Sequence, residues 1–169
     1  MDTLYAPWRD KYVKHSIKHK DDVTVICTFC QIFSSQESDD QLFILKRTDR
    51  IVVLLNLYPY NSGHILIVPV EHAASFEDYS KEVRAEMMEF MTASIMILKK
   101  ELRAEGINTG ANLGKISGAG IPDHLHLHVV PRWLGDTSFI TVVGDTKPIS
   151  VDLKRIYNEL KPAFQALEI

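Results

Sequence analysis

Cysteine is scarce in this chain of 169 residues, which contains only Cys27 and Cys30. A framework of disulfide bonds is therefore excluded. No apolar run approaches the length of a membrane span, and the first 22 residues are polar and contain lysines where a signal peptide needs an apolar stretch. We therefore expect a cytoplasmic protein that does not enter a membrane. In that reducing compartment, the two-residue spacing of the cysteines indicates metal binding or redox chemistry.

Excess positive charge is absent as well. The formal net charge is −3 and the isoelectric point is near 6.1, whereas general binders of nucleic acids or anionic membranes need a basic surface. We therefore expect no nucleic-acid partner, and any phosphate site must be local. Hydrophobic residues make up 46% of the chain and charged residues 24%, which is ordinary for one globular domain with a real core.

The chain is predicted to form a single α+β domain over residues 1–169, with an N-terminal arm at 1–22 and a C-terminal extension at 145–169. A polar loop is expected between Cys30 and Leu42, and a terminal helix over Val151–Leu167. Five apolar runs predict strands, of which the first three should be antiparallel neighbours: Leu42–Arg47, Ile51–Leu57, His64–Val70, Ile107–Leu113 and His124–Pro131.

The most regular pattern predicts a long helix from about residue 77 to 105. Ser75 and Asp78 have the spacing of a capping box, and apolar residues then recur at intervals of three and four as far as Gly106. The methionines in this pattern are interpreted as core residues rather than as contacts to a cofactor. The positions assigned to the core are Val83, Met87, Met91, Ile95, Leu98 and Leu102.

Three histidines stand at alternate positions between Asp123 and Arg132. In a strand, this period places His124, His126 and His128 on one face. Packing alone is a poor explanation, because each buried ring would need its own polar partner. One metal ion cannot bind all three, because the three positions spread over roughly 13 Å of strand and ligand bonds are about 2 Å long. The central and outer histidines must therefore have different roles.

The central histidine can act as a nucleophile that attacks phosphorus and forms a phosphoramidate. Such a site needs donors for the phosphate oxygens and a means of protonating the leaving group. The glycine-rich loop Gly114–Pro122 could bring backbone N–H groups to a phosphate, although an ordinary turn has the same composition. Lys115 and Arg132 could supply charge, or they could be solvated surface residues.

Cys27 and Cys30 allow three interpretations: a redox pair, half of a metal site, or two small buried residues. A redox pair of this spacing usually lies between a strand and the start of a helix, whereas here Gln-Ile-Phe and a polar loop follow. Metal binding is therefore favoured. His72 and His124 are the candidates to complete a tetrahedral zinc site.

The segment Asp123–Trp133 resembles the signature of the histidine triad (HIT) superfamily, and Asn56–Pro69 resembles its other characteristic stretch. The likeness extends from Leu4 to Gly144, and Tyr5–Arg9 and Pro131–Asp136 look like the branch of diadenosine tetraphosphate phosphorylases. The resemblance implies a HIT-like α+β fold, an antiparallel sheet with one long helix and a C-terminal helix. It also implies dimers with a sheet that continues across both subunits, and action at the α-phosphate of nucleotides.

Position by position, the resemblance implies that His126 becomes nucleotidylated and that His128 contacts phosphate oxygens. It places Asn56 and His64 at the nucleotide pocket and Asn112 in the phosphate loop. In zinc-binding members, a Cys-x-x-Cys pair, a histidine after the second stretch and the first triad histidine hold the metal, which matches the quartet reached from spacing. Histidine at the third triad position is typical of hydrolases and phosphorylases, whereas transferases of the galactose pathway have glutamine.

One position departs from a branch of the family. Leu113 stands where the fragile histidine triad hydrolases have a phosphate-contacting glutamine, which argues against an identical specificity for dinucleoside triphosphates. We therefore expect a nucleotide hydrolase or phosphorylase that cleaves dinucleoside polyphosphates such as diadenosine tetraphosphate through a nucleotidyl-His126 intermediate, with structural zinc and no organic cofactor.

Two rival functions remain. A nucleoside phosphoramidase would share this chemistry and differ only in the leaving group. A nucleotide-binding regulatory module without turnover belongs to another class, although binding alone does not require a nucleophile.

In the expected homodimer, the arm with Tyr5, Pro7 and Trp8 packs on the partner or on the sheet edge, and the arm or Trp133 lies at the mouth of the nucleotide pocket.

Overall fold

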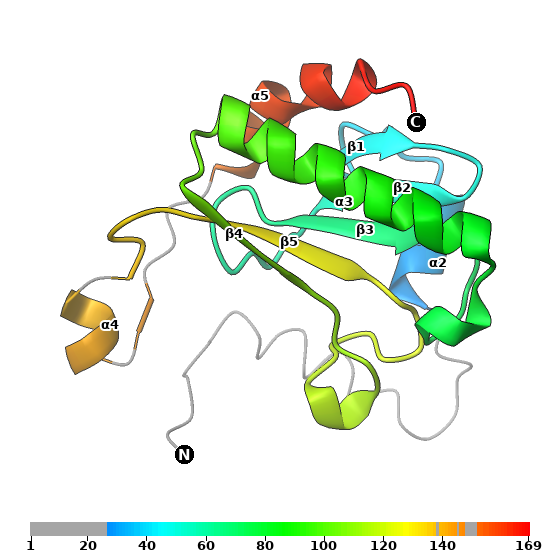
Figure 1. The fold of residues 1–169 in the computed structure, drawn as a ribbon, viewed down its shortest axis with the longest axis horizontal. Coiled ribbons are helices and arrows are strands. Elements are labelled where there is room, and N and C mark those ends of the chain that lie inside the picture. Colours follow the sequence, from blue (N-terminus) through cyan, green and yellow to red (C-terminus); the bar gives the residue numbers. More distant parts are fainter. Residues whose placement is uncertain (1–26, 138, 145, 148–151) are drawn as a thin grey trace.

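The computed structural model describes residues 27–137, 139–144, 146–147 and 152–169, so the predicted N-terminal arm lies outside the described residues. The described chain forms a five-stranded antiparallel sheet in the order β1-β2-β3-β5-β4 (Figure 1). The strands are β1 (Ile44–Arg47), β2 (Ile51–Leu55), β3 (Ile65–Pro69), β4 (Gly106–Gly110) and β5 (Leu127–Arg132). The α+β prediction is confirmed, and all five predicted strands are present with shifted ends.

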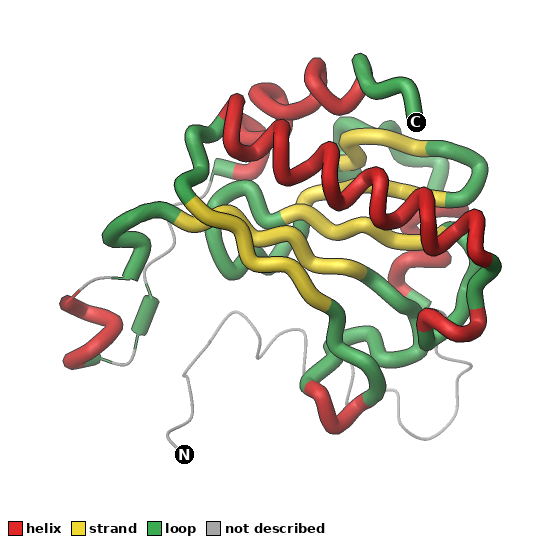
Figure 2. Tube along the Cα trace, viewed as in Figure 1, coloured by secondary structure: helices red, strands yellow, loops and turns green. Residues whose placement is uncertain are grey.

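Helices cover both faces of the sheet (Figure 2). They are α3 (Lys81–Glu101) and α5 (Leu153–Gln165) on one face and the short α2 (Thr28–Ser34) on the other. Strand residues alternate between the two layers, since Val53 packs beneath α3 while Val52 and Leu54 pack with Phe29 of α2. The two-sided cover explains why β2 and β3 are buried along their whole length.

The start of α3 corrects the predicted helix, which was placed four residues too early. The capping box of Ser75 and Asp78 is present, but it caps a single 3-10 turn, η1 (Phe76–Asp78). Tyr79 then adopts an extended backbone and buries its ring, with its hydroxyl bonded to the backbone of the preceding loop. Ser80 caps α3 itself. The burial of Tyr79 therefore separates what the sequence pattern joined into one helix.

The end of α3 also differs from the prediction. The helix stops at Glu101 instead of about residue 105, because Arg103 takes a left-handed φ of 53° and the Ala104 N–H donates to the Leu98 carbonyl at 3.2 Å. The predicted core positions are confirmed in part. Val83, Met87 and Leu98 are buried with Phe90 and Ile97, while Met91, Ile95 and Leu102 are partly buried.

The C-terminal helix α5 is where the sequence placed it and is two residues shorter at each end. Its apolar residues pack into the core beside α3: Ile156, Tyr157, Leu160 and Phe164 are buried, and Leu153 is partly buried. Two polar contacts attach it to the β1 side of the sheet. The Tyr157 hydroxyl donates to Asp40 Oδ1 at 2.7 Å, and Lys161 Nζ donates to the Ile44 carbonyl at 2.7 Å.

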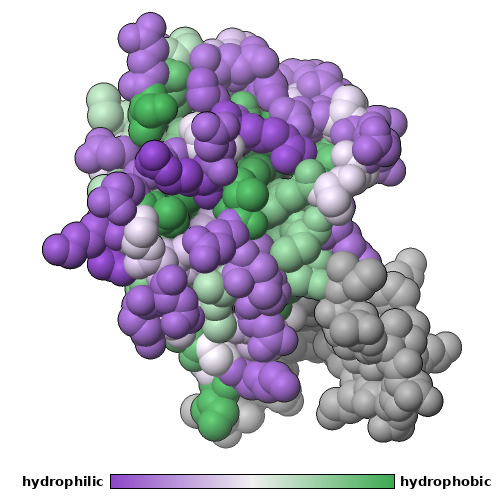
Figure 3. Space-filling model, turned by 90° about the vertical axis from the view of Figure 1, so that its right-hand side faces the viewer, coloured by the Kyte–Doolittle hydropathy of each residue, from purple (hydrophilic) through white to green (hydrophobic). Residues whose placement is uncertain are grey.

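The surface of the described chain is ordinary for a globular domain. Polar side chains cover most of the face shown in Figure 3, and apolar side chains occupy smaller areas between them. A short helix, α4 (Phe139–Val143), projects from the body beyond β5. None of the described helices combines the length and the apolar character that crossing a membrane requires.

Candidate active site and metal centre

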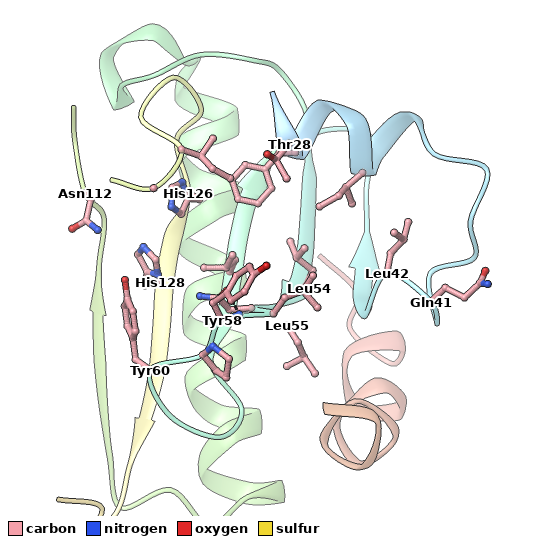
Figure 4. Close-up of a pocket in the computed structure, with 18 of the residues that line it drawn as sticks. Thr28, Gln41, Leu42, Leu54, Leu55, Tyr58, Tyr60, Asn112, His126 and His128 are labelled. Atoms are coloured by element: carbon pink, nitrogen blue, oxygen red, sulfur yellow. Dashed lines mark hydrogen bonds between the residues drawn. The ribbon is translucent and has the colours of Figure 1, made fainter. Parts of the chain in front are cut away.

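A cavity of about 600 Å³ lies on the face of the sheet that α2 covers. His126, His128, Asn56 and Asn112 all line it, and Figure 4 shows both histidines at one end of the group. The structure therefore brings four of the sequence-predicted site residues to one cavity. The rest of the wall is largely apolar and includes Phe29, Ile32, Leu42, Leu54, Leu66 and Ile121.

The three triad histidines do not lie on one continuous strand, which corrects the prediction. β5 begins at Leu127, so only His128 belongs to the strand, and His124 lies in a bend before it. His126 and His128 still neighbour each other, with ring centroids 4.9 Å apart. His124 turns to a separate cluster with Cys27 and Cys30. The structure therefore separates the outer His124 from the central His126 but leaves the outer His128 beside it.

The tautomer of His126 follows from one hydrogen bond. Its Nδ1 lies 2.8 Å from the backbone carbonyl of His124, and because a carbonyl only accepts, Nδ1 carries the proton. Burial lowers the pKa of His126, which favours the neutral ring. Nε2 of His126 therefore holds a free lone pair, as a nucleophile requires.

The tautomer of His128 follows from a chain of two bonds. The backbone N–H of Tyr60 donates to His64 Nδ1 at 3.1 Å, and the Asn56 amide lies 3.3 Å from the same atom. His64 must then carry its proton on Nε2, which donates to His128 Nδ1 at 2.9 Å. The proton of neutral His128 is therefore on Nε2, a buried atom that has no hydrogen-bond partner among the described residues. An unpartnered donor at a cavity wall is suited to an anionic oxygen.

His64 is placed differently from what the resemblance implied. It is only 1% exposed and lies behind His128 rather than in the cavity wall. Burial, with smaller contributions from His128 and His126, lowers the pKa of His64 to about 3. Burial and His126 lower the pKa of His128 to about 4. Both rings are neutral near pH 7, and the position of His64 indicates that it orients His128.

These two pKa values predict that stability declines in mild acid. The unfolded chain takes up protons at histidines below about pH 6.5, whereas folded His64 and His128 resist protonation down to about pH 3 and 4. The free energy of unfolding should therefore be largest above pH 6.5 and should fall as the pH decreases toward 4. Denaturant unfolding of the wild type and of His64→Asn across this interval checks the sign. The variant should lose less stability, and an equal loss would contradict the assignment.

Four predicted metal ligands form one cluster. The ligand atoms of Cys27, Cys30, His72 and His124 all lie within 4.8 Å of one another. Individual separations from His124 Nδ1 are 3.2 Å to Cys27 Sγ, 3.7 Å to Cys30 Sγ and 3.3 Å to His72 Nδ1. Ligands on a tetrahedral zinc, with bonds of about 2.0–2.3 Å, are about 3.3–3.8 Å apart. The spacing therefore fits zinc.

The chemistry of the donors fits zinc as well. His124 Nε2 lies 2.8 Å from the Pro69 carbonyl, so its proton is on Nε2 and its Nδ1 lone pair faces the cluster. Burial, together with the neighbouring Cys27, raises the pKa of Cys30. Two adjacent thiols become thiolates readily only beside a cation, which a bound metal would provide.

A helix that the sequence analysis missed connects the cluster with the cavity. α2 begins directly after Cys27, in a stretch for which no helix was predicted, and the polar segment Ser34–Gln41 expected as a loop between Cys30 and Leu42 is a loop from residue 35 onward. Phe29 therefore lies between the two cysteines and packs on both His124 and His126, at ring centroids 5.3 and 5.2 Å away. Seven residues are too few to give a clear helical period in the sequence.

The charged candidates from the glycine-rich region lie elsewhere. Arg132 forms a two-pronged ion pair with Asp136, at 2.6 and 2.8 Å, and Asn61 donates to the same carboxylate at 2.8 Å. The Arg132 pair holds the pKa of Asp136 far below its usual range. Lys115 is not part of the cavity wall. Neither cation is therefore placed to meet a phosphate at His126.

The aromatic residues at the cavity also differ from expectation. Trp133 packs against the core and donates its indole N–H to the Leu102 carbonyl at 3.2 Å. Tyr58 and Tyr60 line the cavity instead, and the ring of Tyr60 stacks near His128 with centroids 5.7 Å apart. The wall also includes Lys147, a cation for which the sequence offered no motif.

The sequence of this chain is similar to those of known proteins. The HIT domain matches residues 36–133, more than half of the chain. AP-4-A phosphorylase from Mycobacterium tuberculosis is 37% identical over 151 residues, which cover 88% of this chain and 77% of that protein. An adenosine 5′-monophosphoramidase from Schizosaccharomyces pombe is 29% identical over 106 residues, covering 63% of this chain and 74% of the relative.

A solved structure adds a metal-bound relative. A zinc-bound histidine triad family protein from Mycobacterium smegmatis has a TM-score of 0.67 and 27% identity, covering 82% of this chain and 93% of that chain. Its zinc belongs to that protein, and its fold is the fold described above. Through its domain match, its relatives and its architecture, this chain belongs to the HIT family.

Proposed function

We propose that this HIT-family enzyme cleaves dinucleoside polyphosphates, such as diadenosine tetraphosphate, at the α-phosphate through a covalent nucleotidyl-His126 intermediate. The proposal rests on two neighbouring histidines in one cavity that carry their protons on different ring nitrogens. His126 has a free lone pair on Nε2, and the Nε2–H of His128 has no hydrogen-bond partner among the described residues. The 37% identity with the M. tuberculosis AP-4-A phosphorylase supports the choice of substrate.

In the first step, the His126 Nε2 lone pair attacks the α-phosphorus. The N–P bond forms while the bond from phosphorus to the bridging oxygen breaks, and the electron pair leaves on that oxygen. The His128 Nε2–H donates to a non-bridging α-phosphate oxygen, where negative charge concentrates. The bond from His126 Nδ1–H to the His124 carbonyl stabilises the positive charge that develops on the ring.

In the second step, an acceptor displaces the histidine. Water or inorganic phosphate attacks the same phosphorus, the N–P bond breaks, and its electron pair returns to Nε2. The nucleoside carrying the α-phosphate lies along the apolar wall, where Phe29, Ile32, Leu42 and Leu54 provide a surface for a base. Zinc, when held by Cys27, Cys30, His72 and His124, would supply structural stabilisation next to this wall.

Product analysis tests the proposed reaction and identifies the acceptor. Diadenosine tetraphosphate is incubated with the full chain, with and without inorganic phosphate. ADP plus ATP would show phosphorolysis, and AMP plus ATP would show hydrolysis. Cleavage to two molecules of ADP without phosphate uptake would contradict attack at the α-phosphate, and the absence of any turnover would contradict the reaction.

A phosphoramidase activity is the second candidate. The S. pombe relative named for this activity favours it, and the same histidines would act on a phosphorus–nitrogen bond. Comparing kcat/KM for adenosine 5′-phosphoramidate and for diadenosine tetraphosphate separates the two candidates. The larger value identifies the preferred leaving group.

We also propose a homodimer whose sheet continues across the two subunits. In the described part of the chain, one side of β4 has no strand partner, and its residues 108–110 are exposed. Such an edge is open to pairing with a second copy. Sedimentation velocity at micromolar concentration tests this, and a monomer would exclude it.

A further inference from the structure

The cavity wall contains one positively charged and one negatively charged side chain among the described residues. Among the described residues, Lys147 is the one Lys or Arg in the wall and Glu37 the one carboxylate. Glu37 belongs to the same loop as Gln41, which Figure 4 shows far from His126, beyond the apolar side chains. The acidic end is thus remote from the histidines.

Lys147 lines the same cavity as His126 and His128. Its charge contributes to the lowered pKa of Asp136, and Asp136 accepts a hydrogen bond from Asn61. Asn61 directly follows Tyr60, which stacks near His128. Lys147 is therefore within electrostatic range of Asp136, and it lines the cavity together with Tyr58 and Tyr60 of the adjoining loop.

The charge of Lys147 is available to a ligand. Arg132, Asn61, the Trp133 N–H and Thr137 already occupy the Asp136 carboxylate. Within the described ranges, Lys147 has no ion pair of its own. A cation in a cavity wall with no such partner is suited to an anion.

A second polar group comes from the same stretch of chain. Thr141 of α4 also lines the cavity, and its Oγ1 is buried and has no hydrogen-bond partner within the described part of the chain. A buried hydroxyl without a partner is unfavourable unless a ligand supplies one. Lys147 and Thr141 therefore offer one cation and one neutral donor to the cavity that His126 and His128 line.

The proposed reaction requires charge stabilisation that the histidines do not supply. In the tautomers that their hydrogen bonds require, His64 and His128 each carry one proton and no charge, and burial lowers the pKa of both. When the bond between the α-phosphorus and the bridging oxygen breaks, negative charge develops on the leaving polyphosphate. A cation positioned beside that charge lowers the activation barrier of the step. A phosphoramidate has an amine as its leaving group and presents no such charge.

We propose that Lys147 and Thr141 form the subsite for the leaving polyphosphate and set the preference for dinucleoside polyphosphates over phosphoramidates. The inference rests on the proposed function and extends it to the leaving-group side. It assigns direction to the substrate as well, with the retained nucleoside toward α2 and the departing phosphates toward Lys147.

The test compares Lys147→Met with Lys99→Met, which removes an exposed lysine of α3 on the other side of the sheet. Loss of one charge-assisted hydrogen bond corresponds to about 10- to 100-fold. The Lys147 variant should therefore lose at least about tenfold in kcat/KM for diadenosine tetraphosphate, with adenosine 5′-phosphoramidate changed less than about twofold. Lys147→Arg should retain most of the activity, and Thr141→Val should show a smaller loss with the same selectivity. Equal losses for both substrates, or no loss for the tetraphosphate, would overturn the proposal.

Binding measurements separate this inference from the reaction itself. Calorimetric titration with ATP and with AMP reports the phosphate subsite without turnover. Lys147→Met should weaken ATP binding and leave AMP binding unchanged. If the wild type cleaves no dinucleotide but this difference is found, the proposed reaction fails and the subsite stands. If both nucleotides bind the variant as they bind the wild type, the subsite fails whatever the reaction is.

Discussion

Replacing His126 with glycine should reduce turnover of diadenosine tetraphosphate by at least about a thousandfold, the scale typical of removing a nucleophile. Nucleotide affinity should change little, whereas the melting temperature should fall, because the buried ring packs on Phe29 and its Nδ1–H donates to the His124 carbonyl. The bond that Nε2 forms exists only on the reaction path, so its loss affects kcat more than ground-state binding. Initial rates, with calorimetric titration of ATP, measure both quantities.

Two further measurements test the covalent role specifically. Acid-quenched wild type should carry a nucleotidyl group that the glycine variant lacks. Added imidazole should restore part of the turnover, since the vacated space has the size of the missing ring. A variant that keeps more than a few per cent of the wild-type rate would rule out His126 as the nucleophile.

Removal of zinc should cause the largest loss of stability. We expect close to one zinc per chain by elemental analysis, and a melting temperature lowered by at least about 10 °C after chelation or in Cys27→Ser. Structural zinc binding is itself folding free energy, and in a chain of this size each kcal/mol corresponds to about 2–4 °C. The cluster joins α2, the segment after β3 and the entry to β5, which are distant in sequence.

Treatment of the Cys27→Ser variant with the same chelator is the control in this experiment. It should lower the melting temperature of the wild type but leave the Cys27→Ser variant unchanged, because the site is already lost there. Activity should decline in parallel, since the His124 carbonyl that orients His126 belongs to a proposed ligand. Metal-free protein with an unchanged melting temperature would contradict the predicted zinc site.

The sequence predicted the parts of the fold that have a clear period. β2 and β3 are continuous apolar runs, and the long helix has regular apolar spacing, so their presence could be anticipated. The boundaries could not, because tertiary contacts decide them. Burial of Tyr79 interrupts the helix start, and a left-handed Arg103 ends the helix early. Neither event leaves a local pattern.

The residues of the candidate site also differ in how far the sequence could predict them. Cys27, Cys30, His72 and His124 could be grouped because metal ligands have restricted residue types and spacing. Phe29, Thr141 and Lys147 could not, because a wall residue is defined by where distant segments meet and not by its neighbours in sequence. His64 shows an intermediate case, since its residue type was identified correctly while its place behind His128 emerged only in three dimensions.

The attachment of α5 makes the two edges of the sheet different. Both backbone groups of Ile44 are occupied, the N–H by the Asp39 carbonyl at 2.8 Å and the carbonyl by Lys161, and the β1–β2 pairing is irregular between Ile44 and Lys46. Such bonds and bulges make an edge a poor template for another strand. Growth of the sheet by addition of strands is thereby restricted to the β4 side, which favours closed pairs of subunits over open-ended fibres. A helix that lies outside the matched HIT domain would in this way limit how many copies can assemble.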